Sequence, residues 1–175
     1  MRSPRWYVAG LLVVFLVALA GHASADTALR PAPDAGGYRL LTLMNAARAQ
    51  IGVPPLTLHS APMTSAQRYA TLIASVRARF PNNSRLWHTF GGTTVKQRIQ
   101  AAGCAHPRTW GENLAVTATA DRVFTMFMSE PPTPDGHRWH REQILNRKFT
   151  QVGIWHATSP DGTRTYWITD FTAGC

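Results

Sequence analysis

The chain is poor in acidic residues. Its 175 residues include nine aspartates and glutamates against 18 lysines and arginines, and the formal net charge is +9 at pH 7. A strongly basic protein favours anionic partners such as membrane headgroups, cell-envelope polymers or nucleic acid. The basic residues are scattered and almost all arginine, with no basic run interleaved with aromatic residues. This pattern argues against a nucleic-acid-binding protein.

The sequence also lacks a hydrophobic run long enough for a permanent membrane span, which needs about 20 apolar residues. Its longest apolar run, Trp6 to Ala20, follows Arg2 and Arg5 and precedes the small residues Ala23-Ser24-Ala25. That order is typical of a secretory signal peptide. We therefore expect residues 1–25 to be removed on export, and the protein to act in the periplasm or the medium.

Cysteine is scarce as well, with only Cys104 and Cys175 in the chain. In an oxidising compartment the default expectation is one disulfide that pins the C-terminus, and two free thiols are the alternative. Catalysis by cysteine is disfavoured, because the last residue of a chain is a poor place to hold a nucleophile.

The pattern of apolar, polar and turn-forming residues after the signal peptide predicts one α+β domain over residues 38–175. A loose leader over residues 26–37, rich in Ala, Pro and Gly, precedes it. Apolar residues at helical spacing predict helices over residues 38–51, 60–79, 94–102, 121–128 and 138–145. Runs of β-branched and aromatic residues predict strands over residues 110–117, 151–157 and 165–172. Helices followed by antiparallel strands are an α+β order.

Histidines and glutamates supply the candidates for chemistry. Glu112 stands at the mouth of an apolar strand, where a charge is costly unless it is paired, and Glu130 ends a helix with an aromatic face. His88 lies in an aromatic loop, and His137 follows a proline-rich break. His140 lies three residues beyond His137, which would put both on one helical face and suggests a metal pair. For each residue a surface or capping role is the alternative.

An ordered set of short motifs runs through nearly the whole expected domain, over about residues 38–171. In chain order the motifs are Asn45-x-x-Arg48-Ala49 with Gly52-x-Pro54-Pro55-Leu56, Trp87-His88, Arg98-Ile99, Trp110-Gly111-Glu112-Asn113-Leu114, Met126-Phe127-Met128-x-Glu130, Gly136-His137-Arg138, Ile144-Leu145, Phe149-Thr150-Gln151-Val152-Gly153-Ile154 and Tyr166-Trp167-x-x-Asp170-Phe171. The set resembles bacterial members of the CAP superfamily, whose SCP-like domain is shared by cysteine-rich secretory and pathogenesis-related proteins.

The resemblance implies an α/β/α sandwich in which a small antiparallel sheet lies between helices. It also implies a central cavity lined by two histidines and two glutamates, which correspond here to His88, Glu112, Glu130 and His137. In such relatives the histidines can hold a divalent cation, usually discussed as zinc or magnesium. His88 and His137 are therefore the expected metal ligands.

One departure from the family pattern lies next to this site. After Gly136-His137-Arg138 the family usually runs directly into Asn-Ile-Leu, whereas residues Trp139 to Gln143 intervene in this chain. The apparent insertion leaves the local helix geometry open. It also makes His140 and Glu142 candidates for the rim of the cavity.

Three functions remain open, because a fold does not determine a function. The first is a secreted binding module whose cavity holds a divalent cation and which takes an apolar or cell-envelope ligand such as a lipid. The second is a metal-dependent hydrolase, such as a peptidase, with Glu112 or Glu130 as the general base. The third is a purely structural polar network. The oligomeric state is open as well.

Overall fold

The computed structural model describes residues 31–76 and 87–175. The elements in this part of the chain are α1 (Ala35–Gln50), β1 (Thr57–Leu58), α2 (Ser60–Ser75), α3 (Val95–Ala101), β2 (Thr109–Val116), α4 (Ala120–Met128), α5 (Trp139–Leu145), β3 (Gln151–Thr158) and β4 (Thr165–Ala173). The signal peptide expected over residues 1–25 lies outside the described residues. So does the end of the helix that we expected to continue to residue 79.

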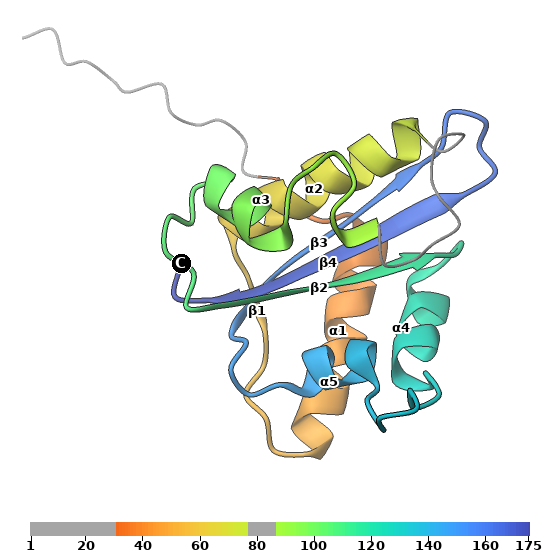
Figure 1. The fold of residues 1–175 in the computed structure, drawn as a ribbon. Coiled ribbons are helices and arrows are strands. Elements are labelled where there is room, and N and C mark those ends of the chain that lie inside the picture. The colour runs from red at the N-terminus through yellow and green to blue at the C-terminus, as the bar shows by residue number, and fades with distance from the viewer. Residues whose placement is uncertain (1–30, 77–86) are drawn as a thin grey trace, which may run out of the picture.

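The elements form three layers with the sheet in the middle. The strand order is β1-β3-β4-β2, in which β4 pairs antiparallel with both β3 and β2. Helices α2 and α3 cover one face of the sheet, and α1, α4 and α5 lie on the other (Figure 1). This confirms the expected α+β sandwich. The sheet is mixed, however, because the two-residue strand β1 adds parallel to β3, and a strand of two residues leaves no periodic signal in a sequence.

Two helices begin earlier than the apolar pattern predicts. Helix α1 starts at Ala35 and not at Tyr38, because the Asp34 carboxylate accepts a hydrogen bond from a backbone N–H of the first turn. Helix α4 is capped by the Thr119 hydroxyl, so that Asp121 lies in the first turn. In both helices a side-chain oxygen of the capping residue accepts a hydrogen bond from a backbone N–H of the first turn, which stabilises that turn.

The central strand β4 is buried on both of its faces. Trp167 and Phe171 belong to the core on the side of α1, α4 and α5, whereas Tyr166 and Ile168 belong to the core under α2. This alternation follows from the two-residue period of a strand. It places Asp170, which has the same parity as Ile168, on the α2 side of the sheet.

Helix α2 lies directly against β3 at Gly153. A Cβ atom added there would lie only 2.1 Å from the carbonyl carbon of Pro62 and 2.2 Å from the amide nitrogen of Met63. No real Cβ atom comes so close to backbone atoms, so any other residue would push α2 away from the sheet. The glycine therefore fixes the distance between these two layers.

A buried arginine connects α1 to the segment that joins α5 to β3. The Arg48 side chain is fully buried and donates hydrogen bonds to the carbonyl oxygens of Pro54 (2.7 Å), Ile144 (2.7 Å), Asn146 (3.1 Å) and Phe149 (2.9 Å). Burial lowers the pKa of its guanidinium. The four carbonyl dipoles replace the water that the charge loses on burial.

The expected disulfide between Cys104 and Cys175 is present and ties the α3–β2 connection to the last residue after β4. The bond spans a sequence separation of 71 residues, for which the chain-entropy model gives a stabilisation of roughly 4 kcal/mol. Among the residues that the structure describes, no helix has the length and apolar character to cross a membrane.

Candidate functional site

The candidate site lies along β2, an edge strand of the sheet. Its backbone is covered by α5: the Gln143 side-chain amide donates to the Glu112 carbonyl oxygen (3.0 Å), and the Asn113 amide donates to the His140 carbonyl oxygen (2.9 Å). Covering an edge strand in this way blocks pairing with another chain. It also anchors α5, and with it His140, against the strand that carries Glu112.

The first histidine–glutamate pair lies on the α2 and α3 side of the sheet. The Glu112 side chain is fully buried, and its Oε1 lies 2.7 Å from His88 Nδ1. Its other oxygen, Oε2, accepts a hydrogen bond of 2.5 Å from Arg98 Nη2. The His88 ring is 37% exposed, so a buried carboxylate holds a ring that reaches solvent.

Arg98 is fixed on several sides. Its Nη1 donates to the carbonyl oxygens of His88 (3.0 Å) and Thr93 (2.9 Å), and its guanidinium lies 3.5 Å from the centroid of the Tyr69 ring. One side chain thus holds both the Glu112 carboxylate and the backbone of His88. Sequence reasoning gave Arg98 no role beyond its place in a motif, because the partners are distant in sequence.

Tyr69 closes this network from α2. Its hydroxyl donates to the Trp87 carbonyl oxygen and accepts from the Phe90 N–H (3.1 Å). Burial raises the pKa of Tyr69 to about 12, although the Arg98 charge acts in the opposite direction. The hydroxyl therefore keeps its proton at neutral pH and holds the loop segment that carries His88.

The second pair lies between the end of α4 and α5. Glu130 Oε1 lies 2.9 Å from His140 Nδ1, and Glu130 Oε2 accepts a hydrogen bond of 2.9 Å from the His140 backbone N–H. The His140 ring stacks on Phe127, with 5.0 Å between the ring centroids. Both side chains are partly exposed, and they line a pocket of about 370 Å³ with Met126, Pro131 and other residues of this region.

His137 occupies a different place from the one that the motif predicts. Its Nδ1 lies 3.1 Å from Glu142 Oε2, its ring stacks on Trp139, and its side chain is 45% exposed. Within the described part of the chain it has no hydrogen bond to Glu130. Of the four expected residues, the structure thus joins His88 to Glu112, joins Glu130 to His140, and leaves His137 on the surface with Glu142.

The sequence contains a signal that identifies His140. The pair His140-Arg141 repeats the pair His137-Arg138 three residues later, and it is followed after one residue by Gln143-Ile144-Leu145. If His140-Arg141 is matched to the family pattern, the apparent insertion shrinks to the single residue Glu142. A glutamine then stands where the family usually has asparagine.

The two pairs share one chemical arrangement. In both, Nδ1 of the imidazole faces a glutamate oxygen, which orients the ring and leaves Nε2 as the nitrogen for a ligand. Among the described residues, no group of three or more His, Cys, Asp or Glu side chains is arranged to hold a metal ion. Nδ1 of His137 also faces a glutamate, but the carboxylate of Glu142 is 46% exposed, so His88 and His140 are the two imidazoles that a buried or mostly buried carboxylate orients.

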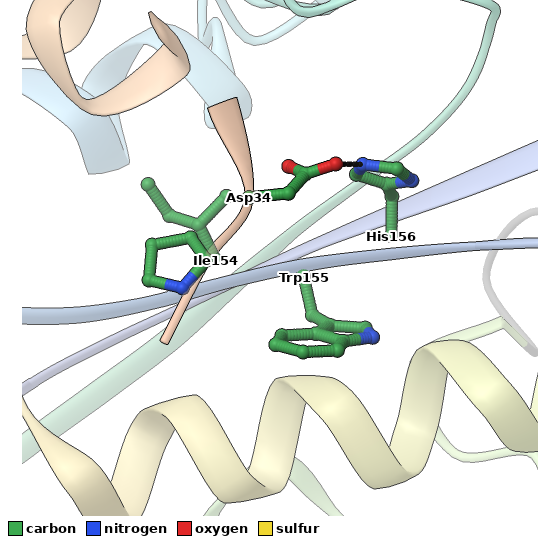
Figure 2. A pocket seen from close by; sticks show the side chains of 5 residues that line it. Asp34, Ile154, Trp155 and His156 are labelled. Carbon is green, nitrogen blue, oxygen red and sulfur yellow. Dashed lines mark hydrogen bonds and ion pairs between the residues drawn. The ribbon is translucent and has the colours of Figure 1, made fainter. Parts of the chain in front are cut away.

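A fourth histidine–carboxylate pair connects the start of α1 to β3 (Figure 2). His156 Nε2 lies 2.8 Å from Asp34 Oδ2, beside a small pocket of about 70 Å³. Burial alone would raise the pKa of Asp34, but the Gly37 N–H and the His156 imidazole outweigh it and lower that pKa. Because Asp34 also caps α1, this pair has a structural explanation and is not part of the candidate site.

Comparison with known proteins agrees with this architecture. Residues 41–171 match the model of the CAP family, described as the cysteine-rich secretory protein family. No curated protein matches in a sequence search.

Among solved structures, an outer surface protein from Borrelia burgdorferi is similar, with a TM-score of 0.62 and 20% identity, over 77% of this chain and 90% of that chain. An extracellular SCP-domain protein from Bacillus anthracis has a TM-score of 0.59 and 17% identity, over 79% of this chain and 40% of that chain. A crystal structure of NaASP2 with Zn²⁺ has a TM-score of 0.54 and 11% identity, over 81% of this chain and 83% of that chain. The family match covers most of the chain, which therefore belongs to the CAP family of cysteine-rich secretory proteins.

Proposed function

We propose that this protein is an exported CAP-domain binding module in which His88 and His140 are ligands for divalent cations, and in which an apolar pocket beside His140 takes a lipid or another cell-envelope ligand. The observation that carries the proposal is the repeated arrangement of the two pairs. Each histidine directs Nδ1 to a glutamate, and each glutamate is held by a further donor, Arg98 for Glu112 and the His140 backbone for Glu130.

The donor set favours zinc over magnesium. Imidazole nitrogen is a common ligand of Zn²⁺, whereas Mg²⁺ requires oxygen ligands in near-octahedral geometry. A carboxylate behind Nδ1 fixes the tautomer in which Nε2 carries the free electron pair, and it raises the basicity of that nitrogen as a ligand. A zinc ion at either imidazole would take its remaining ligands from water or from a bound molecule. The similarity to NaASP2, which was crystallised with Zn²⁺, supports the same choice.

The pocket beside His140 supports an apolar ligand. Leu114, Met126, Phe127 and Pro131 line it together with the polar Glu130 and His140. Mostly apolar walls with a few convergent polar groups are typical of small-molecule sites. The signal-like residues 1–25, the disulfide and the extracellular or outer-surface relatives support export. The net positive charge suits an anionic envelope ligand.

Binding is favoured over hydrolysis by the state of the two glutamates. A general base needs a carboxylate oxygen within reach of the water or group that it deprotonates. Both oxygens of Glu112 are occupied by His88 and Arg98, and both oxygens of Glu130 are occupied by His140. These contacts suit glutamates that orient histidines, so we assign neither Glu112 nor Glu130 as the base of a hydrolase.

Calorimetric titration of zinc and magnesium into the purified protein tests the proposal. We expect zinc to bind more tightly than magnesium, and the double variant His88→Ala/His140→Ala to lose that binding. His137→Ala is the matched control, because it removes a neighbouring exposed imidazole, and it should bind zinc as the unmodified protein does. If His137→Ala alone lost zinc binding, His137 would be a metal ligand as the sequence motif predicts. Absence of zinc binding to the unmodified protein would overturn the cation site.

A further inference from the structure

A second buried carboxyl group lies next to Glu112. Asp170 of β4 is the direct cross-strand partner of Glu112 of β2, so the two side chains lie next to each other on the same face of the sheet. Asp170 is completely buried, and the Glu112 side chain is fully buried as well. Two ionised carboxylates on directly paired residues, away from water, would repel each other strongly.

The surroundings decide which of the two acids carries a proton. Glu112 has two positively charged or proton-donating partners, since Arg98 donates to one oxygen and His88 lies against the other. The hydrogen bond that Asp170 accepts comes from the neutral hydroxyl of Ser65, which donates to Oδ2 at 2.5 Å. The compensated carboxylate is therefore Glu112, and the proton belongs on Asp170.

The hydrogen bonds of Asp170 give an independent indication. Its Oδ1 is buried and finds no hydrogen-bond donor among the residues that the structure describes. A buried carboxylate oxygen without a donor is costly, whereas a protonated oxygen beside a carboxylate becomes a donor itself. A proton on Asp170 thus satisfies an atom that otherwise has no partner.

We propose that Asp170 is a neutral carboxylic acid that donates its proton to the Glu112 carboxylate, and that it is a positioning residue for the Glu112–His88 pair. The proton stays between the two acids, and no bond to a substrate is formed or broken. The resulting chain of contacts runs from Ser65 through Asp170 and Glu112 to His88. The inference concerns the acid pair itself and holds whether or not a cation binds at His88.

The charged and titratable groups around Asp170 agree with this assignment. Burial raises the pKa of Asp170 well above its usual value, and the Glu112 charge raises it further, while Arg98 and the Ser65 hydrogen bond act in the opposite direction. Tyr69 of α2 also faces this group and keeps its own proton. Among these groups only Arg98 carries a positive charge, and it hydrogen-bonds to Glu112.

The protonated acid has a definite effect on the pH dependence of stability. A carboxyl group with a raised pKa in the folded state binds its proton more tightly there than in the unfolded chain. Its contribution is therefore fully present below the unfolded pKa of about 3.8, and it is lost as the pH rises through the folded pKa. The variant Asp170→Asn, which cannot ionise, should gain stability relative to the unmodified protein as the pH rises from about 4.

Infrared spectroscopy of the full chain in D₂O detects the proton directly. We expect the unmodified protein at neutral pH to show the carbonyl band of a protonated carboxylic acid, and Asp170→Asn to lack it. Ser65→Ala is the matched control: it removes the hydrogen bond to Oδ2 but not the proton, so the band should shift and persist. If the unmodified protein has no such band, or if the band survives in Asp170→Asn, the assignment is wrong.

The positioning role needs a readout at His88. The side-chain amide introduced by Asp170→Asn keeps an N–H donor toward Glu112, so this variant should leave the ¹⁵N chemical shifts of the His88 ring unchanged, whereas Asp170→Ala should move them. Because the alanine variant can fail to fold, Asp170→Leu gives a second test with a side chain of similar size and no donor. Unchanged His88 shifts in a folded alanine or leucine variant would overturn the positioning role, and displaced shifts in Asp170→Asn would do the same.

Discussion

The two histidine–glutamate pairs are the same chemical unit held in two different ways. Glu112 is fully buried between the sheet and the helices α2 and α3, where Arg98 and Asp170 surround it. Glu130 follows the end of α4, is 18% exposed, and depends mainly on His140 at the start of the seven-residue helix α5. The glutamate of the first pair is part of the core of the fold, whereas the glutamate of the second pair reaches the surface. Changes near Glu112 should therefore affect stability much more than changes near Glu130.

Arg98→Ala should have the largest effect. It removes the arginine that hydrogen-bonds to Glu112 and leaves a buried carboxylate without that positive partner, which typically costs about 3–5 kcal/mol. Urea unfolding measures the loss. The double variant Arg98→Met/Glu112→Gln should recover part of it, because the uncompensated charge is gone. A loss below about 1 kcal/mol for Arg98→Ala would mean that Glu112 is not held as described.

A matched pair of glutamine variants compares the two glutamates directly. Glu112→Gln keeps the shape of the side chain but weakens its bonds to Arg98 and His88, and we expect a loss of about 1.5–3 kcal/mol in unfolding free energy. Glu130→Gln should lose less than about 1 kcal/mol, because its partners are partly exposed. Equal losses for the two variants would contradict the distinction between a buried and a surface pair.

The smallest effects concern the two histidines of the proline-rich segment and α5. His140→Ala removes the contacts with Glu130 and the stacking on Phe127, and should cost about 1 kcal/mol. His137→Ala removes an exposed ring, and the free energy of unfolding should change by less than about 0.5 kcal/mol. Thermal unfolding of both variants measures their losses in stability. A larger loss in His137→Ala than in His140→Ala would contradict this prediction.

The order of helices and strands could be predicted from the sequence, because apolar residues recur at helical spacing and a turn motif marks the hairpin between β3 and β4. The disulfide followed from the composition. Prediction failed where a single side chain decides the structure. Asp34 extends α1 by a capping hydrogen bond, and the two-residue strand β1 is defined by its pairing with β3.

The site was predicted in part for a similar reason. Trp87-His88 and Gly111-Glu112 are local motifs, and in the structure His88 Nδ1 lies 2.7 Å from Glu112 Oε1. The sequence has two successive His-Arg pairs, His137-Arg138 and His140-Arg141, and the contact with Glu130 distinguishes His140 from His137. Asp170 is paired with Glu112 by the register of β2 and β4. A single sequence does not show which residues of two strands are paired.

The most direct test of the account is a two-bond ¹H–¹⁵N NMR spectrum of the histidine side chains, recorded before and after zinc is added. We predict that His88 and His140 carry their proton on Nδ1 in the metal-free protein, and that zinc shifts the Nε2 signals of both residues. A zinc-dependent shift at His137 in place of His140, or no shift at either His88 or His140, would contradict it.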